Sequence, residues 1–240
     1  MDFAIIAAGE GSRLVQEGVT TLKPLIKIQG IPMIERLIRI FIKNNASSIS
    51  VIVNEEMKEV QEFLQKIRLP VPFHLLIRST LSSMHSFYEL SPYLQNDRFC
   101  LTTVDTIFRE EEFSGYMQAF QNSDTLDGLM AVTDYVDDET PLYVKTDRDL
   151  RILAFGSSTF KDDLAYVSGG IYCLRQSGIR VLKNAISKGM SRMRNYQCRL
   201  IAEGLYLKAY PFSKIIDVDH AEDIIKAEKF LSFKESELYF

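Results

Sequence analysis

The stretch Ala7-Ala8-Gly9-Glu10-Gly11-Ser12-Arg13-Leu14 follows a short apolar run, residues 3–6, at the start of a 240-residue chain. A buried strand that breaks into small residues and two glycines predicts a strand followed by a tight loop. Because glycine has no Cβ, the backbone at Gly9 and Gly11 can approach a ligand closely. Backbone N–H groups clustered after a strand form a concavity that binds anions. We therefore predict that this loop binds a phosphate-bearing ligand, the alternative being a tight turn without a ligand.

Two cations accompany this glycine loop. Arg13 supplies a planar, permanently charged fork, and Lys23 supplies a mobile point charge. The dinucleotide-binding fingerprint does not fit, because Leu14 occupies its third glycine position, and no Gly-Lys-Ser/Thr follows as a P-loop would require. The loop thus offers backbone amides and two positive charges to a polyphosphate, in a pattern of its own.

Composition limits the class of protein. Hydrophobic residues make up 46% of the chain and charged residues 25%, which is ordinary for a globular domain. The net charge of −4 does not favour binding to nucleic acid or to an anionic membrane, and we expect neither partner. Cys100, Cys173 and Cys198 lack metal-type spacing and predict reduced thiols. With no apolar run that could span a bilayer and no leader pattern at the N-terminus, we expect a cytoplasmic protein.

Strands and helices alternate along the first half of the chain. Apolar periodicity predicts strands at residues 3–6, 49–53, 73–77 and 99–104, and helices at 31–45, 55–67 and 110–121. Such alternation is typical of βαβ units, a parallel sheet and helices on both faces. In the second half we expect a hairpin of residues 142–146 and 151–156, a strand at 167–172, helices at 176–188 and 194–203, and a last helix through residue 231.

Polar residues follow the third and fourth of these strands. Residues 78–86 are rich in hydroxyls, which cap helix N-termini and also lie at the sheet edge where α/β proteins bind ligands. His85 stands there without a neighbouring acid or cysteine. Asp105 follows the strand 99–104, at a position suited either to a metal ligand or to a turn. We expect these side chains to share the edge of the sheet with the glycine loop.

Two further features lie near the other end of the chain. Gly169 and Gly170 fall inside a predicted strand, which indicates a bulge or a close ligand approach. Asp217 and Asp219 precede the last helical period, and Asp219 is placed to cap that helix. Cap placement leaves open which of the two aspartates acts as a ligand.

Taken with Lys23-Pro24-Leu25 and Gly30-Ile31-Pro32-Met33-Ile34, the glycine loop resembles that of the nucleotidyltransferases, which include sugar-1-phosphate nucleotidylyltransferases and MobA-like NTP transferases. The resemblance extends to the Gly-Ile-Tyr at 170–172 and the Asp-Val-Asp at 217–219. The serine-rich loop looks closer to relatives of choline-phosphate cytidylyltransferases. The resemblance covers nearly the whole chain and is weakest between Gly156 and Arg199.

The resemblance implies one domain over residues 1–240, with a nucleotide-binding half (1–125) and an acceptor-binding half (126–240). Its fold would be a three-layer α/β/α sandwich with a mostly parallel mixed sheet, the nucleotide-diphospho-sugar transferase fold. The implied reaction moves an NMP group from NTP to a small phosphorylated acceptor, such as a sugar 1-phosphate, and releases pyrophosphate with Mg²⁺ as cofactor.

The same resemblance assigns residues to roles. Arg13 and Lys23 would be catalytic, Asp105 and Asp217 would hold Mg²⁺, and Lys161, Gly169 and Gly170 would contact the acceptor. The nucleotide would lie on Ala7, Ala8, Gly9, Glu10, Gly11, Ser12, Arg13, Ser82, Ser83 and Ser86.

Two other functions remain open on these residues. A glycosyltransferase of related fold would also use a nucleotide and a metal-binding carboxylate, although its usual mid-chain Asp-x-Asp is here Asp105-Thr106-Ile107. A non-catalytic nucleotide-binding regulator need not keep Arg13 and Lys23. Base, acceptor and oligomeric state are not specified by the sequence.

Overall fold

The computed structural model describes residues 1–137, 139–159 and 166–232. The strands are β1 (Asp2–Ala7), β2 (Lys27–Ile28), β3 (Ile31–Pro32), β4 (Ser48–Val53), β5 (Phe73–Ile77), β6 (Arg98–Thr103), β7 (Thr106–Ile107), β8 (Gly128–Thr133), β9 (Tyr143–Thr146), β10 (Ile152–Gly156), β11 (Tyr166–Arg175), β12 (Leu207–Pro211) and β13 (Ile216–Asp217). The helices are α1 (Ser12–Gln16), α2 (Met33–Lys43), α3 (Lys58–Lys66), α4 (Ser83–Leu90), α5 (Glu110–Gln121), α6 (Gln176–Ser187), α7 (Met193–Ala202) and α8 (Ala221–Ser232).

The described residues form one large mixed sheet. Strands β6, β1, β4 and β5 lie side by side and run parallel, with β1 between β6 and β4. Strand β11 joins the other edge of β6 in the antiparallel sense and carries β8 and β9 at its sides. The mostly parallel first half and the antiparallel additions confirm the mixed sheet that we expected.

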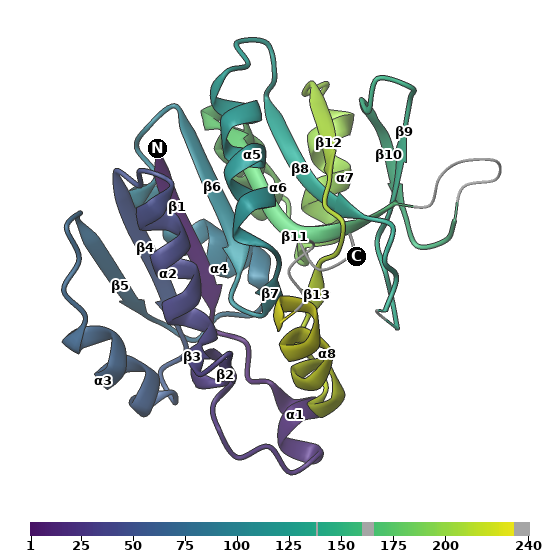
Figure 1. The fold of residues 1–240 in the computed structure, drawn as a ribbon. Helices are drawn as coiled ribbons and strands as arrows, with labels where there is room; N and C mark the ends of the chain where they lie inside the picture. Colours follow the sequence, from purple (N-terminus) through teal and green to yellow (C-terminus); the bar gives the residue numbers. More distant parts are fainter. Residues whose placement is uncertain (138, 160–165, 233–240) are drawn as a thin grey trace.

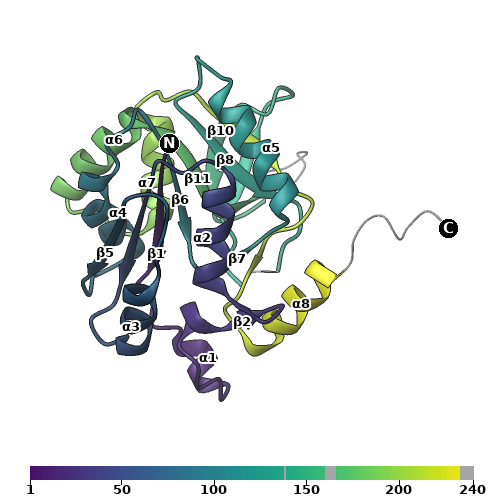
Figure 2. The ribbon, with the colours of Figure 1, turned by 60° about the vertical axis from the view of Figure 1, so that its left-hand side comes forward.

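Helices cover both faces of this sheet, so the molecule has three layers (Figure 1, Figure 2). Successive side chains of a strand point to opposite faces, and those of β1 enter two different cores. Phe3 and Ile5 pack with α2, α3 and α5, whereas Ala4 and Ile6 pack with α4, α6 and α7. Near-complete burial of β1 on both faces explains its unbroken apolar sequence.

A third, smaller core lies beyond the carboxyl end of β1. It joins Leu14 of α1, Ile107 of β7, Val218 after β13 and Ala227 of α8. In both ribbon views α1 and α8 lie together at this end of the sheet, although they come from opposite ends of the chain (Figure 1, Figure 2). This core therefore brings the N-terminal glycine loop to the C-terminal helix.

The expected helix at residues 31–45 begins only at Met33. Gln29 and Gly30 both have positive φ angles, which reverses the chain and pairs β3 with β2. Pro32 then stands at the N-cap with an extended backbone. Apolar periodicity could not show that the helix begins at Met33. The start is set by the turn before it, and this turn depends on Gly30, because glycine readily adopts a positive φ.

Among the described residues, no helix combines the length and the apolar character that crossing a bilayer requires.

Candidate active site

The glycine loop forms one wall of a cleft of about 550 Å³ at the carboxyl ends of β1 and β6. Gly11 is the N-cap of α1 and has φ = +63°, a left-handed conformation that glycine adopts without strain. Most of the predicted nucleotide-binding residues line this cleft: Ala8, Gly9, Glu10, Gly11, Ser12, Arg13, Ser82, Ser83 and Ser86. The fold thus gathers two separate predicted segments around one cavity.

Ala7, also predicted to bind the nucleotide, lies in the core and not at the cleft. Its side chain is 1% exposed and packs in the core between the sheet and α2, so it is not among the residues that line the cleft. As the last residue of β1 it sets where the loop leaves the sheet.

The two loop glycines offer a matched pair of variants. A Cβ at Gly9 would meet nothing within 4 Å, whereas one at Gly11 would lie 3.2 Å from the Lys23 Cβ in a strained backbone. We therefore expect Gly9→Ala to fold like the wild type and yet to bind NTP more weakly, because its methyl group enters the cleft. Gly11→Val should lose NTP binding and also lower the melting temperature, because a β-branched residue is strained at this positive φ. Calorimetric NTP titration of both folded variants checks this, and unchanged affinity in both would contradict a phosphate-binding loop.

The serine-rich loop caps a helix, as we considered, and also lines the cleft. Ser82 is the N-cap of α4, where its Oγ accepts from the His85 backbone N–H at 3.4 Å and lies 2.9 Å from the His85 Nδ1. Ser86 pairs through its hydroxyl with Thr80 at 2.7 Å. Both serines also line the cleft, so the capping role leaves their predicted contact with the nucleotide possible. His85 is held as part of the cap.

Lys23 lies at the centre of the site. Its ammonium donates to Asp105 Oδ2 at 2.5 Å and to Asp219 Oδ1 at 2.6 Å, and the side chain is only 8% exposed. Burial alone would lower the pKa of Lys23, but the two carboxylates outweigh it and raise the pKa. Burial would raise the pKa of Asp105, yet the Lys23 charge keeps that pKa lowered. Both groups are therefore charged at neutral pH.

A short strand pair brings these residues together. Strand β13 pairs antiparallel with β7, with Asp217 opposite Thr106. The Val218 backbone N–H then donates to the Asp105 carbonyl at 3.1 Å. Asp105 and Asp219, far apart in the chain, consequently flank the same lysine.

The prediction that Asp219 caps the last helix is wrong. Asp223 caps it instead, because its Oδ2 accepts from the backbone N–H groups of Asp219 and His220 at 3.1 and 2.8 Å. The Asp219 carboxylate is thereby left to bind Lys23, and Arg13 at 3.1 Å. Asp217, our predicted second metal ligand, lines the neighbouring cavity together with Asp105.

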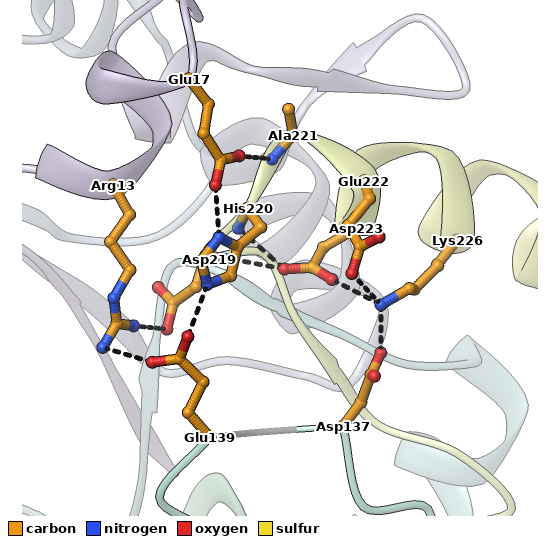
Figure 3. Close-up of polar contacts among 10 residues, drawn as sticks. All are labelled: Arg13, Glu17, Asp137, Glu139, Asp219, His220, Ala221, Glu222, Asp223 and Lys226. Atoms are coloured by element: carbon orange, nitrogen blue, oxygen red, sulfur yellow. Dashed lines mark hydrogen bonds and ion pairs between the residues drawn. The ribbon is translucent and has the colours of Figure 1, made fainter.

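Arg13 is held at the mouth of the cleft by carboxylates (Figure 3). Besides Asp219 it faces Glu139, whose Oε2 lies 3.6 Å from the Arg13 Nη2. Glu139 belongs to the segment between β8 and β9. Its Oε1 also lies 3.8 Å from the His220 Nε2. Arg13 thus links the glycine loop to the second half of the chain.

His220 connects the end of α1 to the start of α8 (Figure 3). Its Nδ1 pairs with Glu17 Oε1 at 2.6 Å, and Glu17 Oε2 accepts from the Ala221 backbone N–H at 2.7 Å. The bond to Glu17 raises the pKa of His220, and the Ala221 N–H, followed by His220, lowers the pKa of Glu17. Nothing in the sequence indicated this pair, because its members are 203 residues apart.

The segment between β8 and β9 is also tied to α8 through Lys226 and Asp137, 2.7 Å apart (Figure 3). The Lys226 bond lowers the pKa of Asp137.

The ion pair between Asp137 and Lys226 should stabilise the fold in a pH-dependent way. Because the Asp137 pKa is lowered by folding, this stabilisation is fully present above the pKa of the unfolded state and is lost as the pH falls through the pKa of the folded state. We expect Asp137→Asn to lower the melting temperature at pH 7, and we expect this gap to the wild type to shrink as the pH falls below the ordinary range of an aspartate pKa and the Asp137 carboxylate becomes protonated. Asp134→Asn is the control, and a gap that persists at low pH would contradict the ion pair.

The residues present fit a divalent cation. Asp105 Oδ1 is buried and has no hydrogen-bond partner among the described residues. Asp105 and Asp219 already converge on one positive charge, that of Lys23. The described residues contain no group of three or more acidic, histidine or cysteine side chains that could hold a metal. Two carboxylates suit Mg²⁺, which usually binds one or two of them together with substrate phosphates.

The two glycines predicted to contact the acceptor line two different cavities, Gly169 one and Gly170 the other. Gly170, with φ = +72°, lines a cavity of about 360 Å³ that also contains Asp105 and Asp217. A Cβ at Gly170 would lie 3.2 Å from the Thr103 and Thr106 hydroxyls, so glycine is required for both space and backbone. A Cβ at Gly169 would lie 2.2 Å from the Ile215 Cδ1, so this glycine has a packing role. The register of β11 shifts at this point, as a bulge would produce. Lys161 lies outside the described residues.

Comparison with known proteins agrees with this architecture. The MobA-like NTP transferase domain model matches residues 3–157. The bifunctional protein GlmU of Thermodesulfovibrio yellowstonii is 26% identical over 244 residues, covering 96% of this chain and 52% of that protein. GlmU of Methanococcus maripaludis strain C5 is 24% identical, covering 95% and 53%. The chain therefore spans about half the length of the curated relatives it matches.

Solved structures show the same fold. The inositol-1-phosphate CTP transferase from T. maritima superposes with a TM-score of 0.79 at 18% identity, covering 96% of this chain and 94% of that one. A putative glucose-1-phosphate thymidylyltransferase from Bacillus anthracis gives 0.80 at 20% identity, with coverages of 96% and 94%. The CTP:phosphocholine cytidylyltransferase from Streptococcus pneumoniae gives 0.75 at 18%, with coverages of 96% and 98%. The fold is thus the nucleotide-diphospho-sugar transferase fold that we expected, and the chain belongs to the MobA-like NTP transferase domain family.

Proposed function

We propose that this protein transfers a nucleoside monophosphate from NTP to a small phosphorylated acceptor and releases pyrophosphate, with Mg²⁺ as cofactor. The observation that carries the proposal is the buried Lys23 ammonium between Asp105 and Asp219, at the floor of the cleft that the glycine loop lines. A glycine loop, two cations and two carboxylates around one cleft suit a triphosphate.

In this reaction an oxygen of the acceptor phosphate attacks the α-phosphorus of NTP, and the bond to pyrophosphate breaks. The attacking oxygen is already ionised near neutral pH, so the site needs no general base. Catalysis then depends on positioning and on stabilising negative charge. Lys23 would stabilise the negative charge on the α-phosphate. Arg13 would bind the departing pyrophosphate, because its guanidinium fork can bind two oxygens.

Asp105 and Asp219 are the residues that would hold Mg²⁺, replacing the pair Asp105 and Asp217 that we first expected. Bound there, the ion would neutralise phosphate charge. The buried, unpaired Asp105 Oδ1 supports this assignment. Asp219 is preferred because its carboxylate, like that of Asp105, already lies against Lys23.

Pyrophosphate release over a panel of NTPs and phosphorylated acceptors tests the proposal. We expect release that requires both substrates and matches the NDP-linked product one to one. A glycosyltransferase would consume an NDP-sugar and release NDP, and a regulator would bind nucleotide without turnover. Either of these results would overturn the proposed function.

A further inference from the structure

Ser82 lies at the junction of two cavities. It lines both the nucleotide cleft and the neighbouring cavity of about 360 Å³. Ser83, Thr103 and Asp105 are the other described residues that line both, so these four mark the junction. With NTP in the cleft, an acceptor oxygen that approaches the α-phosphorus from the neighbouring cavity comes close to this junction. Ser82 is therefore placed to contact the attacking phosphate.

His85 holds the Ser82 hydroxyl and lines neither cavity. The Ser82 Oγ accepts from the His85 backbone N–H at 3.4 Å and lies 2.9 Å from the His85 Nδ1. When Nδ1 carries no proton, the Ser82 hydroxyl donates to it, and Oγ keeps a lone pair that can accept one more hydrogen bond. His85 can thus act on a substrate only through Ser82.

The His85 ring can exchange a proton with solvent. In the part of the chain that the structure describes, the ring bonds only to Ser82, and its Nε2 is not a buried atom. Glu89, one turn further along α4, is engaged by Arg78. The other charged groups near the pair line the neighbouring cavity together with Ser82, and they are Asp105, Asp217, Arg192 and Arg194. Histidine is the side chain that ordinarily changes its charge near neutral pH.

The acceptor phosphate of the proposed reaction carries a removable proton in the same pH range. A phosphate monoester loses its second proton at about pH 6. At the junction, the like charges of a triphosphate and of Asp105 favour the protonated form of an incoming phosphate. Well above this range the attacking oxygen is ionised and needs no base. Below it, the protonated fraction must lose its proton before it can attack with full charge.

We propose that Ser82 and His85 form a proton relay for the acceptor phosphate. The O–H bond of the phosphate breaks as its proton passes to the Ser82 Oγ, and the Ser82 hydroxyl hydrogen passes at the same time to the His85 Nδ1. His85 becomes an imidazolium, which returns its extra proton to solvent after turnover. This inference rests on the proposed function and adds two residues to its reaction.

The dependence of kcat on pH tests the relay, because kcat reports groups in the enzyme–substrate complex. The assay measures pyrophosphate release at saturating NTP, Mg²⁺ and acceptor. His85→Asn offers Ser82 an amide oxygen that can accept its hydrogen bond but takes up no proton. Between about pH 8 and about pH 5.5, we expect kcat of His85→Asn to fall about tenfold further than that of the wild type.

The possible results separate the relay from the proposed function. A wild-type pH profile in His85→Asn would overturn the relay and leave the proposed function standing. No pyrophosphate from wild-type protein with any NTP and acceptor would overturn both. His74→Gln is the control, since His74 lies against the Tyr93 ring at 4.9 Å, and its pH profile should match the wild type.

Two further measurements hold if His85→Asn does not fold. Ser82→Ala keeps the imidazole but removes the hydroxyl, so its kcat should show the same loss at low pH. Nitrogen-15 spectra of neutral His85 should show the proton on Nε2 in the wild type, because Nδ1 accepts from Ser82. A proton on Nδ1, or a wild-type pH profile in Ser82→Ala, would contradict the relay.

Discussion

Lys23→Ala is expected to lower kcat about a hundredfold, the usual effect of removing a group that stabilises transition-state charge. The apparent KM for NTP should rise far less, because the contact strengthens only as charge develops on the phosphates. The Lys23 side chain is buried and its ammonium is held between two carboxylates, so it has little conformational freedom. Its position is therefore set before the substrate arrives.

Two controls separate this role from simple binding. Lys27→Ala removes an exposed lysine four residues further on and should leave both constants unchanged. Arg13→Ala should weaken NTP binding as well as the rate, since its half-exposed fork would hold the leaving pyrophosphate. Melting curves must accompany these assays, because removing Lys23 leaves Asp105 and Asp219 facing each other. An unchanged kcat with a raised KM would show that Lys23 only binds substrate.

Chelation is expected to have the largest effect of all. EDTA should abolish turnover and added Mg²⁺ should restore it, because the substrate phosphates and both carboxylates are negative and a divalent cation would screen them. Full activity in EDTA after exhaustive dialysis would contradict a metal requirement.

The identity of the ligands can be tested in the same assay. Asp105→Asn and Asp219→Asn should each shift the Mg²⁺ concentration needed for half-maximal rate upward by about tenfold or more. Asp217→Asn is the matched comparison, since it alters a neighbouring aspartate on β13. A larger shift for Asp217→Asn than for Asp219→Asn would restore the assignment that the sequence first suggested.

The sequence was sufficient to predict the layered fold and the tight glycine loop after β1. Both depend on local patterns: the all-apolar β1 buried on two faces, and the glycines that follow it. Asp105 could be placed for the same reason, because it lies two residues after the end of the buried strand β6.

Contacts between distant segments were beyond such patterns. The positions of Asp217 and Asp219 depend on a two-residue strand pair, β7 with β13, that is too short to leave a periodic signal. The start of α8 is held by Asp223, since a carboxylate inside the first turn can reach back to the backbone N–H groups of Asp219 and His220. Nothing in the sequence linked Glu139 to Arg13 across the molecule.

The central claim is that an acceptor phosphate oxygen attacks the α-phosphorus of NTP in the cleft that contains Lys23. The most direct test uses an acceptor whose phosphate is labelled with ¹⁸O, with mass analysis of both products. The account predicts that all of the label remains in the NDP-linked product, one labelled oxygen becoming the bridge between the two phosphates, and that pyrophosphate carries none. Label in pyrophosphate or in free phosphate, or product formed without pyrophosphate, would contradict it.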